Sequence, residues 1–315
     1  MLPPPPVRGA YRTDVRARAA YAEGAGIYRI LPEAISRPAD VEDLKTLIAW
    51  ATEHRVSLVP RGAGSAMGGG NVGNGVVVDL TGMSDRRLQI DPPRRSAVTT
   101  AAVTLAELAA AAAPFGLRLP PDPSSGRWAT LCGMVSTNAA GARSVRYGSV
   151  RRWIEALTLV SADGDSVKLL RGDTRPHARA LDRFQRDAAP RIQAASRLIT
   201  DRFPRTRKNS SGYALDAYLA SGDVLDLIIG SEGTLGIVTE IEWRLDAVPA
   251  FRAGLRVHLS SLAHLGDVVA ALNQFQPSAL ELLDRSFLDL LGEDRLSTAG
   301  LSSGIKAIVL VELER

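Results

Sequence analysis

The residues best suited to chemistry lie in one glycine-rich stretch, which runs Arg61-Gly-Ala-Gly-Ser-Ala-Met-Gly-Gly-Gly70. A backbone with so few Cβ atoms can turn sharply and present several N–H groups to a single anion. Arg61 would add a fixed positive charge at the entrance of this loop. The stretch therefore predicts an anion-binding loop, and an ordinary glycine-rich turn is the alternative.

Two common phosphate-binding motifs do not fit this stretch. A dinucleotide fingerprint of the G-x-G-x-x-G type leads into a helix. Here the glycines stand at Gly62, Gly64 and Gly68, and the apolar run Val76–Leu80 follows. A P-loop ends in Gly-Lys-Ser/Thr, but this loop has no lysine. The phosphate in question must therefore belong to another kind of ligand.

The composition is that of a globular protein large enough for two domains. Of the 315 residues, 45% are hydrophobic and 23% are charged. The net charge of +4 is carried by scattered arginines, and only 5% of the residues are aromatic, which argues against nucleic-acid binding. No apolar run reaches the length of a membrane span, and the N-terminus lacks the pattern of a signal peptide. We expect a cytoplasmic protein, for which peripheral membrane contact stays open.

Metal and thiol chemistry have little support in the sequence. The single cysteine, Cys132, excludes a disulfide framework and a Cys-rich iron–sulfur site within this chain. The histidines at His54, His177, His258 and His264 lie in no recognisable motif. We therefore predict no metal ligands and assign no catalytic residue.

Periodicity predicts the elements that must position the loop. Asp40 is a plausible N-cap for an amphipathic helix, and Thr104 with Glu107 forms a capping box for a helix that Gly116 ends. Strict alternation over Ile237–Leu245 predicts a half-buried strand. The other predicted elements are strands at Val56–Val59, Val76–Leu80, Arg95–Val103, Ile154–Ser161 and Ser166–Leu170, and a helix over residues 176–202.

The pattern changes near Val248, which predicts a second α+β domain. Its expected elements are a strand at Leu255–Leu259, helices at Leu262–Leu272 and Ala279–Leu291, and a strand at Lys306–Glu314. We therefore divide the chain into an N-terminal extension (1–36), a main domain (37–248) and a partial second domain (249–315).

Several segments, taken in order, carry a family resemblance. They are the first loop, Pro121-Asp-Pro-Ser-Ser125, the stretch from Thr130 to Gly141 with Tyr147-Gly148, Lys208–Leu215 and Gly230-Ser-Glu-Gly-Thr-Leu-Gly-Ile-Val238. Together they resemble the FAD-binding domain of the vanillyl-alcohol oxidase and p-cresol methylhydroxylase (PCMH) type. The most similar branch is that of the glycolate oxidase flavin subunit and D-lactate dehydrogenase. The resemblance covers residues 37–246. It implies an α+β fold, with a two-subdomain FAD-binding domain followed by the start of a ferredoxin-like cap domain.

The resemblance implies that FAD is the cofactor. Attachment would be non-covalent, because Ser65 stands where some relatives carry a linking histidine. The first loop would hold the pyrophosphate, and the small residues after Thr130 would let the backbone lie against the cofactor. The implied cofactor-binding residues are Arg61, Gly62, Ala63, Gly64, Ser65, Gly69, Pro123, Ser124, Thr130, Gly133, Ser136, Asn138, Gly141, Tyr147, Glu232, Gly233, Ile237 and Val238.

Some of these side chains have a purely structural alternative. Asn138 is alternatively a turn residue with a local hydrogen bond, Glu232 a surface carboxylate and Tyr147 a packing residue. Arg143 is alternatively a solvated charge. Relatives carry paired glycines where this chain has Cys132-Gly133, so its backbone is less free there.

The implied reaction is the oxidation of a 2-hydroxy acid such as D-lactate or glycolate. Hydride would pass from C2 to the flavin, and the electrons would then pass to a quinone, a partner protein or an iron–sulfur module. The histidines and carboxylate that the family carries in its cap are not found before Arg315, so the cap looks incomplete. The alternatives are an FAD-binding subunit or fragment without independent turnover, and a nucleotide-binding module without flavin.

Overall fold

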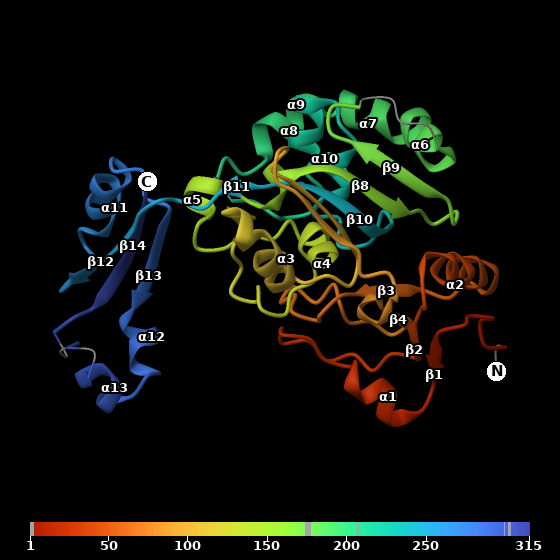
Figure 1. Cartoon of the computed structure of the whole chain (residues 1–315), viewed down its shortest axis with the longest axis horizontal. Helices are drawn as coiled ribbons and strands as arrows, with labels where there is room; N and C mark the ends of the chain where they lie inside the picture. The colour runs from red at the N-terminus through yellow and green to blue at the C-terminus, as the bar shows by residue number, and fades with distance from the viewer. Residues whose placement is uncertain (1–2, 174–177, 207, 299, 302–303) are drawn as a thin grey trace.

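The structure is a computed structural model that describes residues 3–173, 178–206, 208–298, 300–301 and 304–315. Three main sheets follow one another along the chain (Figure 1). In Figure 1 the first sheet (red and orange) lies beneath the second (green and cyan), and the C-terminal unit (blue) lies to one side. The two glycine-rich loops come from the first two sheets.

The first sheet carries the first glycine-rich loop at the end of a strand. Its order is β1-β2-β4-β3. β1 (Ala10–Arg12) is antiparallel to β2 (Ala34–Arg37), whereas β2 and β3 (Leu58–Arg61) both run parallel to β4 (Val76–Asp79). The loop leaves β3 at Arg61, two residues beyond the predicted end of that strand. Because β1 and β2 pair within this sheet, residues of the expected N-terminal extension form half of it.

The helix predicted from Asp40 is confirmed as α2 (Val41–His54). The Asp40 carboxylate accepts a hydrogen bond from the Asp43 N–H, and the apolar face with Leu44 and Leu47 is fully buried. The only other helix before it in the described chain is the short α1 (Val15–Ala20). Burial of its apolar face, more than propensity, therefore explains why α2 is the long helix of this region.

The second sheet is antiparallel and contains the predicted half-buried strand at its centre. Trp243 on that strand is fully buried, and its Nε1–H donates to Thr99 Oγ1 at 2.9 Å. The order β5-β6-β10-β8-β9 joins β5 (Leu88–Asp91), β6 (Ser96–Thr100), β10 (Ile237–Arg244), β8 (Ile154–Val160) and β9 (Ser166–Leu170).

Short elements connect the second sheet to the rest of the molecule. The capping box is confirmed at the start of α3 (Leu105–Ala112), since Thr104 and Glu107 bond each other's backbone N–H groups. The chain then passes through a small sheet of β7 (Leu117–Arg118) and β11 (Asp246–Ala247). Two short helices follow β7, α4 (Leu131–Ser136) and α5 (Ser144–Tyr147).

The single helix predicted over residues 176–202 is wrong in its continuity. Residues 176–177 lie outside the described chain, and the rest divides into α6 (Arg179–Arg183), a π-helical turn (Phe184–Ala188), α7 (Ala189–Ala194) and α8 (Ser196–Arg202). Pro190 has no N–H to donate, so the regular ladder shifts register at this point. Two further helices, α9 (Leu215–Ser221) and α10 (Leu225–Ile228), complete this layer.

The C-terminal unit is a three-stranded antiparallel sheet of order β12-β14-β13. β12 (Arg252–Leu259) and β14 (Ala307–Glu314) agree with prediction, as does α11 (Leu265–Asn273). The helix predicted at Ala279–Leu291 is wrong in its first half, which forms β13 (Ala279–Asp284).

The physical reason for this error is tertiary pairing. β14 is the central strand, and β13 supplies the partners for its second edge, from Ala279 opposite Glu312 to Asp284 opposite Ala307. Asp284 then caps the next helix by accepting from the Phe287 N–H. That helix is α12 (Arg285–Asp289), and α13 (Glu293–Thr298) follows it.

One hydrophobic core joins the first two sheets, and separate small clusters lie in the C-terminal unit. Among the described residues, no helix is both long and apolar enough to cross a membrane. The α+β fold predicted from the sequence is confirmed.

Candidate functional site

A cavity of about 260 Å³ lies between the first glycine-rich loop, α4 and the loop that precedes β10. The predicted residues that line it are Arg61, Gly62, Ala63, Gly64, Ser65, Thr130, Gly133, Ser136, Glu232, Gly233, Ile237 and Val238. The structure therefore brings together residues that are up to 177 positions apart, from the two loops and from α4.

The first loop offers a row of unused backbone donors to this cavity. None of the N–H groups from Ala63 to Gly70 donates to an acceptor in the part of the chain that the structure describes. Unpaired N–H groups are rare in folded proteins unless water or a ligand satisfies them. Gly64 has a φ of 74°, and a Cβ there would overlap the Arg61 guanidinium. The loop thus has the geometry of an anion cradle.

Arg61 closes this loop instead of standing free at its entrance. Its Nη1 donates to the Asn71 carbonyl at 3.2 Å, and the guanidinium lies 5.4 Å from the ring centre of Tyr21. The Tyr21 hydroxyl in turn donates to Asp79 at 2.6 Å. Burial lowers the pKa of Arg61 below its usual value. The side chain predicted to attract an anion therefore also fixes both ends of the loop.

The second glycine-rich loop is anchored on the end of α4. The N–H groups of Gly230 and Glu232 donate to the carbonyls of Val135 and Ser136, at 3.0 and 2.8 Å. Glu232 adopts a left-handed conformation with a φ of 53°, which few non-glycine residues do.

The Glu232 carboxylate fixes how the two loops meet. It lies so close to Gly70 that a Cβ on this glycine would overlap it. On the other side, Thr130 caps α4 by accepting from the Gly133 N–H, and its hydroxyl leaves no room for a Cβ on Gly62. The glycines therefore allow both loops and α4 to pack against each other around the cavity.

Two buried asparagines carry unsatisfied polar atoms next to this site. The amide oxygens of Asn71, which lines the cavity, and of Asn138 have no hydrogen-bond partner in the described chain. Asn138 is 5% exposed, has a φ of 47° and lies against Gly230. Buried acceptors of this kind normally find a donor. Hydroxyl or amide groups of a bound ligand would supply one.

Several predicted residues do not line the cavity. Gly69 packs under the Tyr28 ring, and Gly141 packs on the backbone of Asp122. Asn138 lies behind the second loop. Pro123, Ser124 and Tyr147 also lie outside the lining, and Ser125 lines the cavity in place of Ser124.

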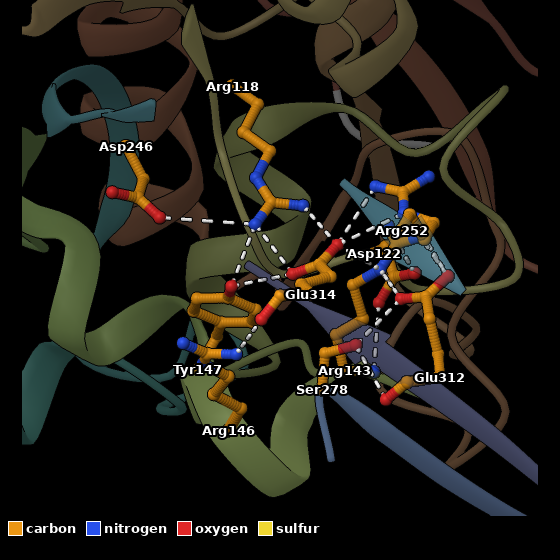
Figure 2. A network of polar contacts seen from close by, with 10 residues as sticks. All are labelled: Arg118, Asp122, Arg143, Arg146, Tyr147, Asp246, Arg252, Ser278, Glu312 and Glu314. Atoms are coloured by element: carbon orange, nitrogen blue, oxygen red, sulfur yellow. Dashed lines mark hydrogen bonds and ion pairs between the residues drawn. The ribbon is translucent and has the colours of Figure 1, made fainter. Parts of the chain in front are cut away.

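Tyr147 belongs to a polar network that ties the C-terminal unit to the main domain (Figure 2). Its hydroxyl donates to Glu314 Oε2 at 2.6 Å and accepts from Arg118 at 2.8 Å. Arg118 also pairs with Glu314 at 2.7 Å, and Arg143 pairs with Glu312 at 2.6 Å. Arg143 is therefore a partner of the C-terminal strand and not a solvated charge.

The charges in this network shift the pKa values of its acids. Burial alone would raise the pKa of Glu314, but hydrogen bonds from Arg118 and Tyr147 outweigh it and lower the pKa to about 2. Burial raises the pKa of Asp122, although Arg143 lies 3.0 Å away. Glu314 is thus held as a buried carboxylate between cations.

Sequence reasoning missed part of the lining. The missed residues are Pro60, Ala66, Met67, Gly68, Gly70, Asn71, Leu80, Ser125, Ala129, Cys132, Met134 and Thr137, whereas Ala139 belongs to the small residues expected to lie against the cofactor. Most of them adjoin predicted positions, so the motif boundaries alone could have found them. Cys132 is buried, which raises the pKa of its thiol, so it packs as a small apolar side chain. Among the described residues, no group of three or more His, Cys, Asp or Glu side chains is placed to hold a metal ion.

The donors and acceptors at this site fit FAD. A row of free N–H groups suits its pyrophosphate, and buried amide oxygens suit its hydroxyl and N–H groups. A family model described as an FAD binding domain matches residues 32–170.

Curated relatives are similar over most of this chain but are much longer. The glycolate oxidase subunit GlcD of Bacillus subtilis (strain 168) is 29% identical over 90% of this chain and 52% of its own length. The D-lactate dehydrogenase of Anaerostipes hadrus is 31% identical, over 81% of this chain and 45% of its own. The D-2-hydroxyglutarate dehydrogenase of Pantoea ananatis (strain AJ13355) is 27% identical, over 91% of this chain and 29% of its own length. The chain thus spans about half, or less, of the length of these relatives.

Solved structures support the fold alone. An alkyldihydroxyacetonephosphate synthase superposes with a TM-score of 0.65 at 18% identity, covering 96% of this chain and 53% of the other. A BBE-like 1 protein of Physcomitrella patens superposes with a TM-score of 0.63 at 18% identity, covering 98% of this chain and 55% of the other. The chain thus carries a match to an FAD binding domain at residues 32–170, and over most of its length it is similar to a glycolate oxidase subunit and to D-lactate and D-2-hydroxyglutarate dehydrogenases.

Proposed function

We propose that this chain is the flavin-binding part of an FAD-dependent dehydrogenase that oxidises a 2-hydroxy acid such as D-lactate or glycolate. The observation that carries the proposal is the row of unused N–H groups from Ala63 to Gly70, in residues that all line the cavity except Gly69, opposite the second glycine-rich loop. The names of the relatives supply the substrate class. Oxidation would break the C2–H and O–H bonds of the substrate and leave a 2-oxo acid.

The chain's own residues would bind and orient the cofactor. The first loop would hold the pyrophosphate, with Arg61 keeping the loop closed. An adjoining cavity of about 310 Å³ shares Pro60, Gly233 and Ile237 with the first, and its other walls include Ile48 and Ala51 of α2. Apolar walls of this kind suit a flat heteroaromatic ring, so we assign the adenine to it. FAD supplies a two-electron acceptor at the other end.

We infer that the cofactor is held without a covalent bond. Ser65 lines the cavity, and no histidine is among the described lining residues. The electron acceptor would be a quinone, a partner protein or an iron–sulfur module. A cytoplasmic location and a peripheral membrane contact stay predictions.

The alternative is an FAD-binding subunit or fragment that does not turn over alone. The observation in its favour is the share of the relatives that this chain spans.

One experiment distinguishes the dehydrogenase from the FAD-binding subunit or fragment. Purified protein is titrated with FAD and then mixed with a redox dye and a panel of 2-hydroxy acids. Dye reduction that depends on both FAD and one hydroxy acid supports the dehydrogenase. FAD uptake without turnover supports the subunit or fragment, and a folded protein that takes up no FAD contradicts both.

A further inference from the structure

A third cavity, remote from the first glycine-rich loop, lies between the β8–β9 hairpin and the helices that cover it. Its volume is about 250 Å³, and its walls come from β8, β9, α6, α7, α9 and α10. Figure 1 shows these helices gathered along one side of the second sheet. Protein interiors rarely leave voids much larger than a water molecule. A cavity of this size is therefore a candidate binding site.

The walls of this cavity are almost wholly apolar. Leu181 of α6, Phe184 of the π-helical turn and Ile192 of α7 form the helical side. Leu159 of β8 and its cross-strand partner Val167 form the sheet side. π-helical turns occur preferentially at functional sites, and here one forms part of a cavity wall.

One buried polar atom breaks this apolar surface. Ser161 follows β8 directly and continues its alternation, so its side chain falls on the same face as Leu159. Ser161 is 3% exposed, and its Oγ has no hydrogen-bond partner in the described chain. A buried hydroxyl without a partner is costly, and a ligand oxygen would relieve that cost.

We propose that this cavity binds a compact aromatic molecule that carries one hydroxyl or carbonyl oxygen. The ring packs between Phe184 and the leucine and valine side chains of the hairpin, and the oxygen hydrogen-bonds with Ser161 Oγ. An apolar cavity of roughly 150 Å³ already accepts benzene, so this larger one has room for two fused rings. The aromatic side chain in the wall favours an aromatic ligand through edge and face contacts.

This site goes beyond the proposed dehydrogenase and does not depend on it. Two residues link the cavity to the cofactor site: Leu235 belongs to the second glycine-rich loop, and Ser161 also lines the adjoining cavity to which we assign the adenine. The Tyr213 hydroxyl shares a hydrogen bond of 2.8 Å with Thr234 of the same loop. Occupancy of the cavity would therefore restrain the loop, and Ser161 would lie between the ligand and the adenine.

The test uses 1-naphthol, with naphthalene as its counterpart without oxygen. Both are titrated against the full chain in excess FAD, which occupies the cofactor cavity, and binding is followed by probe fluorescence. We expect saturable binding with a preference for 1-naphthol. Ser161→Ala should reduce this preference about two- to tenfold while naphthalene binding stays unchanged.

Cavity-filling variants locate the bound probe. Ala188→Leu and Ala180→Leu fill the cavity from two different helical segments and should each abolish binding of both probes. Ala194→Leu, on the exposed side of α7, is the matched control and should bind normally. Circular dichroism identifies a variant that fails to fold, in which case the other filling variant decides. The proposal is overturned if the wild type shows no saturable binding, if a folded filling variant still binds, or if Ser161→Ala leaves the preference intact.

Discussion

At the scale of single residues, the glycines of the first loop matter because of what stands beside them. Gly64 combines a left-handed backbone with a guanidinium packed directly against its Cα. Arg61 can close the loop only because no side chain intervenes. The free N–H groups of the loop depend on this closure, so one substitution at Gly64 should remove them as a group.

Gly64→Val should therefore weaken FAD binding at least tenfold. A β-branched residue at a φ of 74° costs about 1–2 kcal/mol in the backbone, before the overlap with Arg61 is counted. Titration with FAD, followed by quenching of flavin fluorescence, measures the effect. Gly254→Val is the control, because Gly254 lies in β12 with open space around it. Equal FAD affinity in the two variants would show that the loop is not the pyrophosphate site.

At the scale of elements, short helices rather than long ones position the second loop. α10 leads directly into it, and Asp226 of α10 accepts from Arg151 and Arg171, both at 2.9 Å. Burial would raise the pKa of Asp226, but these two arginines outweigh it and lower it. The helix is thereby fixed to the end of the β8–β9 hairpin.

Asp226→Asn should destabilise the protein by about 3 kcal/mol, because it leaves the partly buried Arg151 guanidinium without its counter-charge and Arg171 with Asp223 alone. FAD affinity should fall as well, since the second loop follows α10 directly. Urea unfolding and FAD titration measure the two effects. Asp216→Asn on the exposed side of α9 should change neither by more than about 0.5 kcal/mol. Unchanged stability in Asp226→Asn would contradict this role.

Elements with a local signal could be predicted from the sequence, and those set by distant partners could not. Asp40 caps its helix through its own neighbours, and Trp243 lies on a strand whose alternation is visible in the chain. By contrast, the leucines of Ala279–Asp284 suggest a helix, and only pairing with β14 makes this segment a strand.

The same distinction applies to the site. The glycine-rich loops are recognisable by their composition, so about half of the cavity lining was predicted residue by residue. The role of Tyr147 was not, because its partner Glu314 lies 167 residues away and neither residue carries a local signal. The position of the Arg61 guanidinium also depends on Tyr21 and Asn71, which no motif connects to it.

At the scale of the whole molecule, a buried polar network joins the C-terminal sheet to the main domain. Glu314 of β14 receives hydrogen bonds from Arg118, Tyr147 and Arg252. Its side chain is 1% exposed, so this is a desolvated group held by several donors and not a surface ion pair. The network fixes where the C-terminal unit lies relative to α5.

Glu314→Gln should lower the free energy of unfolding by about 3 kcal/mol, because the buried Arg118 would keep only the longer pair with Asp246 at 4.0 Å. Cleavage of the chain between β11 and β12 should become faster, which limited proteolysis would detect. Glu155→Gln removes an exposed pair with Arg244 and should change stability by less than about 0.5 kcal/mol. Similar effects of the two substitutions would show that the network does not hold the C-terminal unit in place.

The same carboxylate predicts how stability depends on pH. Its pKa is about 2 in the folded protein, below the usual value of 4.5, so its contribution is complete above pH 4.5. That contribution is lost as the pH falls from about 4.5 towards 2. Urea unfolding at a series of pH values should show the loss in the wild type and a flatter profile in Glu314→Gln. If stability fell with pH in the same way in the wild type and in Glu314→Gln, the lowered pKa would not belong to Glu314.

FAD binding by the purified chain tests the central claim most directly. The protein is incubated with FAD, freed of excess cofactor and examined by absorbance, and acid is then added to precipitate it. We predict flavin absorbance that stays with the protein until acid releases it into the supernatant, because Ser65 offers no covalent link. A folded protein that keeps no flavin would contradict the account.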